Sequence, residues 1–223
     1  NLLGEPVENG IFARKGLVIG DVQSGKTANY ISVINKAADA GYKVIVLLTG
    51  TIEKLRQQTQ SRIDEGFIGI DTSDLERERR NNPIGVGLIN GGVSVSSFTS
   101  IIKDFNKSVL TNSNVPLDSL SIPLILVVKK NKAVLNSIYK LFNGEKKDQT
   151  YNKINQSLLF IDDEADNASI NTNSQDDDPT SINKSIRRIL GLFMRSSYVG
   201  YTATPYANVF IEPNTKEDME NED

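Results

Sequence analysis

The chain has 223 residues, of which 38% are hydrophobic and 24% charged, a composition typical of a globular protein with one well-buried core. It contains no Cys, His or Trp, which excludes disulfides, thiol or imidazole nucleophiles and Cys/His zinc sites. The formal net charge of −3 is uneven: the last seven residues hold five acids, and the remainder has 25 basic against 23 acidic residues. Charge therefore neither favours nor excludes a polyanionic partner.

No apolar run is long enough to span a bilayer, and the first residues lack the pattern of a signal peptide. We therefore expect a soluble, cytoplasmic protein with no membrane partner. The chain begins at Asn1 rather than at a methionine, which favours a piece of a longer protein. The polar insert 171–178 is predicted to be flexible and the acidic tail 213–223 to be disordered.

Short apolar runs alternate with segments of helical period, a pattern typical of β–α units that build a mostly parallel sheet. In chain order we predict strand 16–20, helix 28–38 ended by Gly41, strand 43–48, helix 52–63, a solvated charged run 76–80, a weaker strand 84–89 interrupted by glycines, strand 124–128, helix 134–142, strand 158–161, helix 182–194 and strand 198–201. The expected fold class is α/β, with one domain over residues 16–212 after a lead-in at 1–15.

The most specific motif lies between the first predicted strand and helix and matches G-x-x-x-x-G-K-[ST]. In such a loop, backbone N–H groups and the helix N-terminus bind phosphate oxygens, Lys26 adds positive charge, and the Thr27 hydroxyl ligates Mg²⁺. We therefore expect this loop to bind ATP and Mg²⁺ as cofactors. The alternative is a glycine-rich turn that only caps a helix, and the position of the loop between a strand and a helix disfavours it. The predicted nucleotide-binding residues are Gly20, Asp21, Val22, Gln23, Ser24, Gly25, Lys26, Thr27 and Ala28.

A second motif is the apolar strand 158–161, which runs directly into Asp162, Asp163, Glu164 and, after Ala165, Asp166. Like charges so close together need a cation. In a P-loop ATPase the Asp at the strand end holds Mg²⁺ through water, and the adjacent Glu orients or deprotonates the attacking water. An acidic loop that is merely solvated is the alternative, and the P-loop upstream disfavours it.

A third motif, Thr202-Ala203-Thr204-Pro205, completes an order that resembles motifs I, II and III of superfamily 2 helicases and translocases. The chain is more similar still to the Z-one domain family, described as endonucleases and interpreted as helicase-like ATPases. The similarity runs from about Gly16 to Phe210 and is carried by residues 16–30, 36–42, 55–60, 127–131 and 162–166. It implies a RecA-like P-loop domain, a three-layer α/β/α sandwich that forms the first motor lobe of a DNA-dependent ATPase in a bacterial or phage restriction or defence system.

The resemblance also implies roles for single residues. It makes Lys26 and Thr27 phosphate and Mg²⁺ ligands, Asp163 the Mg²⁺ holder and Glu164 the base. The register is open by one residue, so Asp162 remains a candidate metal ligand. Thr202 and Thr204 match the motif that couples phosphate state to movement of the lobes.

The same resemblance predicts contacts with the nucleic-acid backbone after two strands. The first group lies at the end of the second strand and comprises Thr49, Thr51, Arg56, Gln57 and Thr59. The second lies between a strand and a helix and comprises Lys129, Lys130 and Asn131. In both groups a solvated helix start is an equally good explanation.

Two departures from the superfamily limit the expected activity. Gln23 stands where most members have glycine, and the motifs of a second lobe, with their arginine finger, have no counterpart. Because such an arginine can raise the rate by orders of magnitude, we expect nucleotide binding with slow hydrolysis. Full activity is expected to need DNA and a second RecA-like lobe, beside a nuclease or ATPase partner.

Rival interpretations remain at this stage. A nucleotide-switched recruitment module without turnover would use the same loop, and a small-molecule kinase would bind an acceptor near 162–166. A GTPase is disfavoured because Asn-Lys-x-Asp is absent. An endonuclease component is a further alternative, although the chain has no Pro-Asp dipeptide and Glu145-Lys146-Lys147 matches only the second half of such a site.

Overall fold

The structure is a computed structural model that describes residues 3–7, 10–20, 25–74, 83–90, 95–105, 117–145, 147–166 and 179–203. Its centre is a single six-stranded sheet with the order β1-β6-β5-β2-β4-β3, in which all neighbours are parallel. The strands are β1 (Phe12–Ile19), β2 (Val44–Thr49), β3 (Ser96–Ser97), β4 (Leu124–Lys129), β5 (Ile154–Asp163) and β6 (Phe193–Thr202). The expected α/β class is thus confirmed, and all carboxyl ends of the strands meet at one edge of the sheet.

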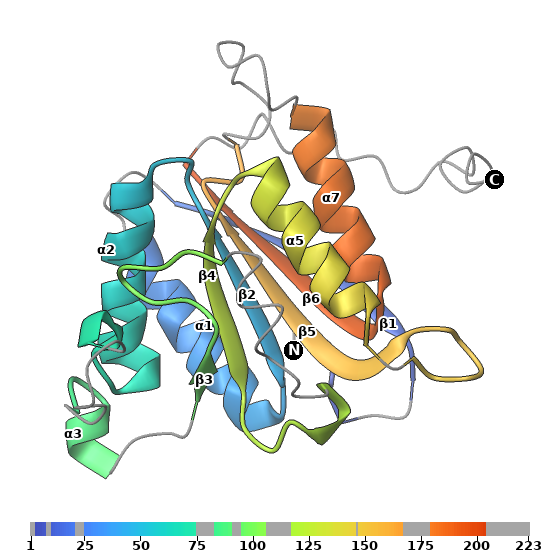
Figure 1. Cartoon of the computed structure of the whole chain (residues 1–223), viewed down its shortest axis with the longest axis horizontal. Coiled ribbons are helices and arrows are strands. Elements are labelled where there is room, and N and C mark those ends of the chain that lie inside the picture. Colours follow the sequence, from blue (N-terminus) through green and yellow to red (C-terminus); the bar gives the residue numbers. More distant parts are fainter. Residues whose placement is uncertain are drawn as a thin grey trace.

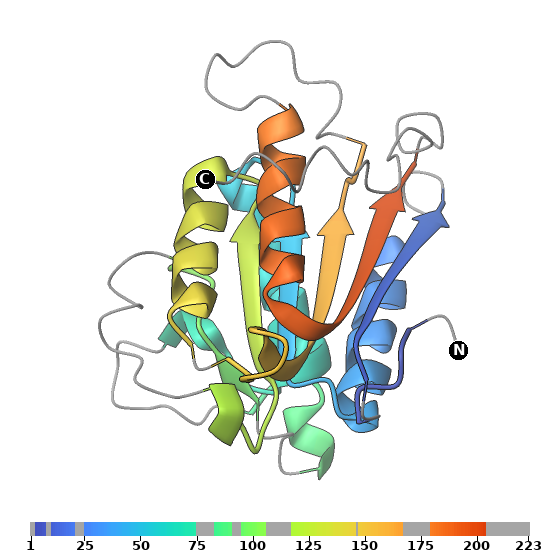
Figure 2. The same ribbon diagram turned by 90° about the vertical axis from the view of Figure 1, so that its right-hand side faces the viewer.

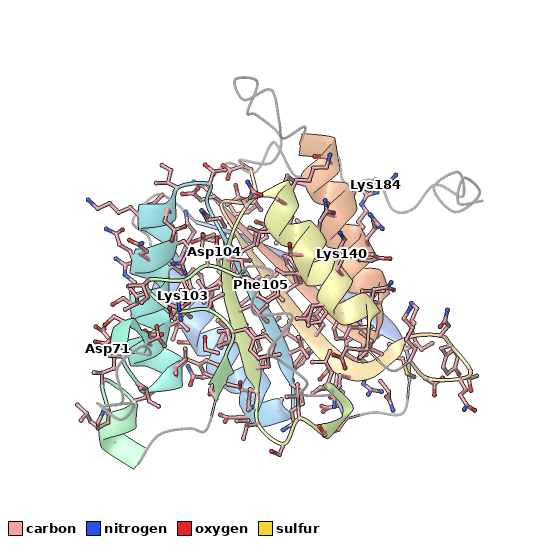
Figure 3. All side chains as sticks on the ribbon, in the orientation of Figure 1. Asp71, Lys103, Asp104, Phe105, Lys140 and Lys184 are labelled. Atoms are coloured by element: carbon pink, nitrogen blue, oxygen red, sulfur yellow. The ribbon has the colours of Figure 1, made fainter. Side chains whose placement is uncertain are left out.

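Helices cover both faces of this sheet and make a three-layer sandwich (Figures 1 and 2). One face carries α1 (Lys26–Ala40) and α2 (Glu53–Ile63), which continues into the π-helical turn η1 (Asp64–Ile68). The other face carries α5 (Lys132–Asn143) and α7 (Pro179–Gly191), whose exposed Lys140 and Lys184 are labelled in Figure 3. Short elements complete the described chain: η2 (Thr72–Asp74), α3 (Gly87–Asn90) and η3 (Leu117–Ser119).

The central strands read as continuous apolar runs because both of their faces are buried. In β2, Val44, Val46 and Leu48 pack toward α5 and α7, whereas Ile45 and Leu47 pack toward α1. All five are fully buried. This alternation also decides which side chains at the strand ends face which helical layer.

The helix ends follow local sequence signals. Gly41 adopts a left-handed conformation at φ 109° and its N–H caps α1, which confirms the predicted end of that helix. Asn131 begins α5, and its side-chain oxygen accepts hydrogen bonds from the N–H groups of Ala133 and Val134 at 2.8 and 3.3 Å.

Two predicted elements are wrong. Residues 84–89 form a turn and the start of α3 rather than a strand, because Gly85 has φ 49° and Gly87 packs directly on the backbone of Gly69. Phe193 and Met194 belong to β6 rather than to the preceding helix. The polar residues that follow them interrupt the apolar pattern, so the sequence does not indicate where β6 begins. The predicted segments 76–80, 171–178 and 213–223 lie outside the described residues.

The predicted lead-in contributes to the core. Residues 12–15 are part of β1, and Gly4 is buried against the ring of Phe12. The carbonyl of Gly4 accepts a hydrogen bond of 2.8 Å from the Tyr42 hydroxyl, which also contacts Ser197 Oγ at 2.8 Å. The sheet therefore begins before residue 16, and the segment ahead of it is fastened to the sheet.

A buried polar cluster joins α2 to the loop that follows β3. The Asp64 carboxylate accepts hydrogen bonds from Gln60 Nε2 at 2.9 Å, from Thr72 N at 3.0 Å and from the Thr72 hydroxyl. Thr99 Oγ1 donates to Gln60 Oε1 and accepts from the N–H of Val127, both at 2.9 Å. Asp64 is fully buried, and burial raises its pKa to about 6 despite these donors.

This raised pKa predicts a pH-dependent stability. A carboxyl with a folded pKa of about 6 and an ordinary value of 3.8 stabilises the fold fully only below pH 3.8, and loses that contribution as the pH rises through 6. Between pH 4 and 7, the unfolding free energy of the wild type should therefore fall by about 2 kcal/mol relative to that of Asp64→Asn. Urea unfolding at several pH values measures this difference, and parallel profiles for the two proteins would contradict it.

Candidate functional site

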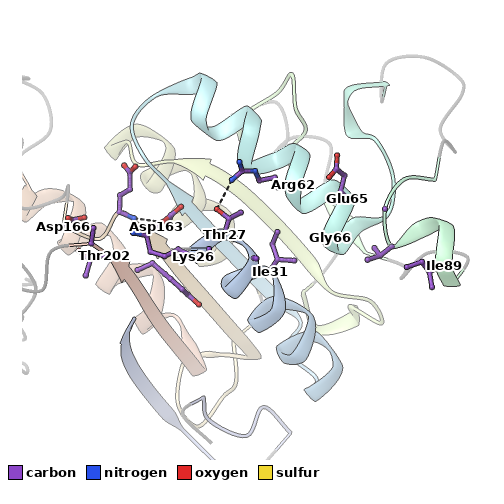
Figure 4. A pocket seen from close by; sticks show the side chains of 17 residues that line it. Lys26, Thr27, Ile31, Arg62, Glu65, Gly66, Ile89, Asp163, Asp166 and Thr202 are labelled. Atoms are coloured by element: carbon purple, nitrogen blue, oxygen red, sulfur yellow. Dashed lines mark hydrogen bonds between the residues drawn. The ribbon is translucent and has the colours of Figure 1, made fainter. Parts of the chain in front are cut away.

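A cavity of about 1180 Å³ opens at the carboxyl ends of β1, β5 and β6 (Figure 4). Its walls come from the first turns of α1, the end of α2 with η1, the segment that includes Gly85 and Ile89, the acidic loop after β5 and the end of β6. The polar side chains that line it are Lys26, Thr27, Arg62, Glu65, Asp163, Glu164, Asp166, Tyr201 and Thr202. Described residues from all three sequence motifs thus line the same cavity.

The P-loop motif contributes the floor of this cavity. Gly25 takes a left-handed conformation at φ 77° directly before α1, a position that favours glycine, and Lys26 and Thr27 open the helix. Lys26 Nζ donates a hydrogen bond of 2.9 Å to the carbonyl of Gly20. Ala28 also lines the cavity. The intervening predicted phosphate-binding residues, Asp21, Val22, Gln23 and Ser24, lie outside the described residues.

Asp162 and Asp163 are neighbours in β5, so their side chains point to opposite faces of the sheet. Asp162 faces the α5 and α7 layer, is 1% exposed and accepts a hydrogen bond of 2.9 Å from the Tyr198 hydroxyl. Asp163 faces the α1 layer and lines the cavity. Burial, together with the charge of Glu164, raises the pKa of Asp163. Of Asp162 and Asp163, only Asp163 is therefore placed to meet a ligand in the cavity.

Lys130 forms an ion pair and hydrogen bonds with the start of the acidic loop that follows β5. Its ammonium lies 2.8 Å from Asp162 Oδ1 and donates to the carbonyls of Asp163 and Glu164 at 3.2 and 2.6 Å. The residue is 3% exposed. Lys130 was predicted to contact nucleic acid, and in the structure its charge is matched inside the protein by Asp162.

Glu164 stands in an unusual backbone conformation beside the end of β2. Its φ is 56°, and its N–H donates a hydrogen bond of 3.1 Å to Asp163 Oδ1. A Cβ on Gly50 would lie 2.7 Å from Glu164 Oε2, so this glycine leaves the space that the carboxylate occupies. Sequence reasoning missed Gly50, and its position directly after the second predicted strand is the signal that could have found it.

The end of β6 is tied to the P-loop by backbone and side-chain contacts. The N–H of Gly20 donates to the carbonyl of Thr202 at 3.0 Å, and the Tyr201 hydroxyl donates to Asn29 Oδ1 at 2.8 Å. Burial and the charge of Asp163 raise the pKa of Tyr201 to about 12, so this donor keeps its proton at neutral pH. Thr204, the second predicted coupling residue, lies outside the described residues.

Two further residues predicted to contact nucleic acid, Arg56 and Thr49, have buried side chains. Arg56 is fully buried and donates to the carbonyls of Ser100 and Ile101 at 2.9 and 2.8 Å and to Glu53 Oε1 at 2.8 Å. Thr49 is 2% exposed, and its hydroxyl donates to the carbonyl of Val128 at 3.1 Å. Both side chains are therefore occupied by hydrogen bonds inside the protein, near the carboxyl edge of the sheet.

The other predicted contacts are more accessible. Lys129 is partly exposed but pairs with Glu53 at 2.8 Å and with Asp104 at 3.7 Å. The side-chain oxygen of Asn131 accepts the hydrogen bonds that cap α5. Thr51 is exposed, and Gln57 and Thr59 are half-buried. The accessible candidates thus lie on the segment from the end of β2 into α2.

Glu145 and Lys147, from the run Glu145-Lys146-Lys147 that matches the second half of a nuclease site, do not lie on a strand as such a site requires. Glu145 follows α5 rather than a strand, and its Oε2 accepts a hydrogen bond of 2.9 Å from the N–H of Leu117. Lys147 Nζ donates to Asn143 Oδ1 at 3.0 Å, and Lys146 lies outside the described residues. This carboxylate stabilises a loop.

The donor set of the cavity fits Mg²⁺ together with a polyphosphate. A hydroxyl oxygen from Thr27 and a carboxylate from Asp163 are hard ligands, and Mg²⁺ commonly takes only one or two protein oxygens while phosphates and water complete its shell. In the described part of the chain, no group of three or more acidic residues forms a metal-only cage. The oxygens of Thr27 and Asp163 would thus supply two ligands to a Mg²⁺ whose other ligands are phosphates and water.

The parallel sheet and the pocket at its carboxyl edge define the class of this domain, which is RecA-like. The sequence model of one family, described as type III restriction enzyme, res subunit, matches residues 12–207. The chain belongs to this family of helicase-like superfamily 2 domains. No match was found among curated proteins or among solved structures.

Family membership supports a helicase-like ATPase module of restriction-type systems and implies interaction with nucleic acid. ATPases of this kind use ATP and Mg²⁺. Among the described helices, none has the length and apolar character needed to cross a membrane.

Proposed function

We propose that this chain is the ATP-binding first motor lobe of a DNA-dependent ATPase or translocase of the Z-one type, in a bacterial or phage restriction or defence system. The observation that carries the proposal is that Lys26, Thr27, Asp163 and Glu164, from motifs far apart in the sequence, line one cavity. We assign residues 16–212, with the strand that begins at Phe12, to this lobe.

Each side chain has a separate task in the proposed reaction. Bound Mg²⁺–ATP supplies the scissile bond and a metal that polarises it. Lys26 would place a positive charge against the phosphates, and Thr27 and Asp163 would hold the ion. Glu164 would accept a proton from the attacking water as the water oxygen bonds to the γ-phosphorus. The bond from that phosphorus to the β,γ-bridging oxygen would break, and ADP would leave. Thr202, whose carbonyl accepts a hydrogen bond from the Gly20 N–H, would pass a change at the phosphates to β6.

The partners in this proposal are DNA and a second RecA-like lobe, beside a nuclease or second ATPase. Thr51, Gln57 and Thr59 are the residues that we propose for the DNA backbone, because they are accessible on the segment that leads into α2. By itself the lobe should hydrolyse ATP slowly, since no arginine finger from another lobe completes the site.

The decisive test is calorimetric titration with Mg²⁺–ATPγS. We expect saturable, Mg²⁺-dependent binding that Lys26→Ala weakens on the order of 100-fold, because a charged contact to phosphate is lost. Lys36→Ala, which removes the same charge from the exposed side of α1, is the matched control and should leave the affinity unchanged. Absence of binding by the wild type, or equal binding by Lys26→Ala, would refute the proposal.

A further inference from the structure

Arg62 reaches from α2 to the P-loop threonine. Its NH1 donates a hydrogen bond of 3.2 Å to Thr27 Oγ1, and its side chain lines the cavity (Figure 4). Among the residues that the structure describes, no carboxylate pairs with this guanidinium. Arg56, on the same helix, has all its donors directed at protein oxygens. The two arginines of α2 therefore have different roles.

The contact between Arg62 and Thr27 conflicts with the role proposed for the threonine. The oxygen that accepts from Arg62 is the one that would ligate Mg²⁺, and two cations at one oxygen repel each other strongly. This repulsion favours departure of Arg62 from Thr27 when the ion binds. Because the residue is exposed at the cavity and carries a long side chain, it can move without disturbing the core.

Phosphate oxygens are the acceptors that would be added to the cavity at that moment. A guanidinium presents a planar set of donors that matches a phosphate, and it keeps its charge at any physiological pH. Thr27 lies between Asp163 and Arg62 in Figure 4. The hydroxyl and the carboxylate mark the end of the site where the metal and the terminal phosphates belong, so Arg62 stands beside that end.

We infer that Arg62 is a second phosphate-binding cation of this lobe, which exchanges Thr27 for the terminal phosphate and makes the site prefer a nucleoside triphosphate over a diphosphate. This inference rests on the proposed function. It gives the lobe a positive charge of its own at the terminal phosphate, independent of any residue from a second lobe. Lys26, by contrast, serves both nucleotides.

The test compares Mg²⁺–ATPγS and Mg²⁺–ADP by calorimetry. Arg62→Ala should weaken ATPγS binding by about ten- to a hundred-fold and ADP binding by less than about three-fold, whereas Lys26→Ala should weaken both. Arg62→Lys should recover part of the preference. Lys54→Ala removes one charge from the exposed side of the same helix and should change neither affinity.

The outcomes separate the two ideas. If the wild type binds both nucleotides and Arg62→Ala changes neither affinity, or lowers both equally, the inference about Arg62 is overturned while the nucleotide site stands. If the wild type binds neither nucleotide, the proposed function fails and this inference fails with it. The thermal midpoint of Arg62→Ala should stay near that of the wild type, because the residue is exposed.

Discussion

Lys130→Met is expected to lower the free energy of unfolding by about 3–5 kcal/mol, because the substitution leaves the Asp162 carboxylate buried without its cation. The same change removes the donors to the carbonyls of Asp163 and Glu164. We therefore also expect the acidic loop to lose its fixed conformation. Urea unfolding at equilibrium measures the first effect.

The neighbouring lysine offers a matched control. Lys129 is partly exposed and pairs only near the surface, so Lys129→Met should cost less than about 1 kcal/mol. Equal losses for the two variants would contradict the assignment of Lys130 to a buried pair. A double variant, Lys130→Met with Asp162→Asn, should regain much of the stability because no uncompensated charge remains, but its acidic loop would still lack the lysine donors.

Glu164→Gln is expected to keep Mg²⁺–ATPγS binding while phosphate release falls by roughly 10²–10⁴-fold, because the amide cannot accept the proton of the attacking water. Steady-state phosphate release beside calorimetry separates the two effects. An unchanged rate would remove Glu164 from the reaction. A wild type that binds ATPγS but shows no turnover, with or without DNA, would instead favour the recruitment module.

Gly50→Ala tests the position of that carboxylate without changing its chemistry. The new methyl would meet only the tip of the Glu164 side chain, so the fold should be retained while turnover falls. Gly191→Ala is the matched control, since a Cβ at Gly191 meets nothing within 4 Å. Equal turnover in both variants would mean that the observed Glu164 conformation is unimportant.

Much of the fold could be predicted because its central strands are apolar on both faces and its helices have clear periods. Val44 to Leu48 and Leu124 to Val128 leave no other way to bury such runs. The first residues of β5 and β6 were harder to predict, because Gln156 and Arg195 interrupt the apolar pattern there. In the sequence, the ten-residue strand β5 therefore shows an apolar run of only four residues, 158–161.

The candidate site could be predicted at the level of motifs but not of single contacts. Sequence alone cannot decide between Asp162 and Asp163, since the answer depends on which face of β5 meets α1. It also cannot show that Arg56 and Lys130 are buried, because their partners come from residues 100–101 and 162–164. Long-range packing converts two apparent surface cations into internal supports.

The outer strand of the sheet sets a practical limit on how this domain can be shortened. A fragment that starts at residue 16 would lose half of β1 and the Gly4 contact with Tyr42, and would leave the first residues of β6 with unpaired N–H and C=O groups. Such a bare edge invites pairing between chains. Recombinant versions of the lobe should therefore keep the residues from Leu3 onward if they are to stay monodisperse.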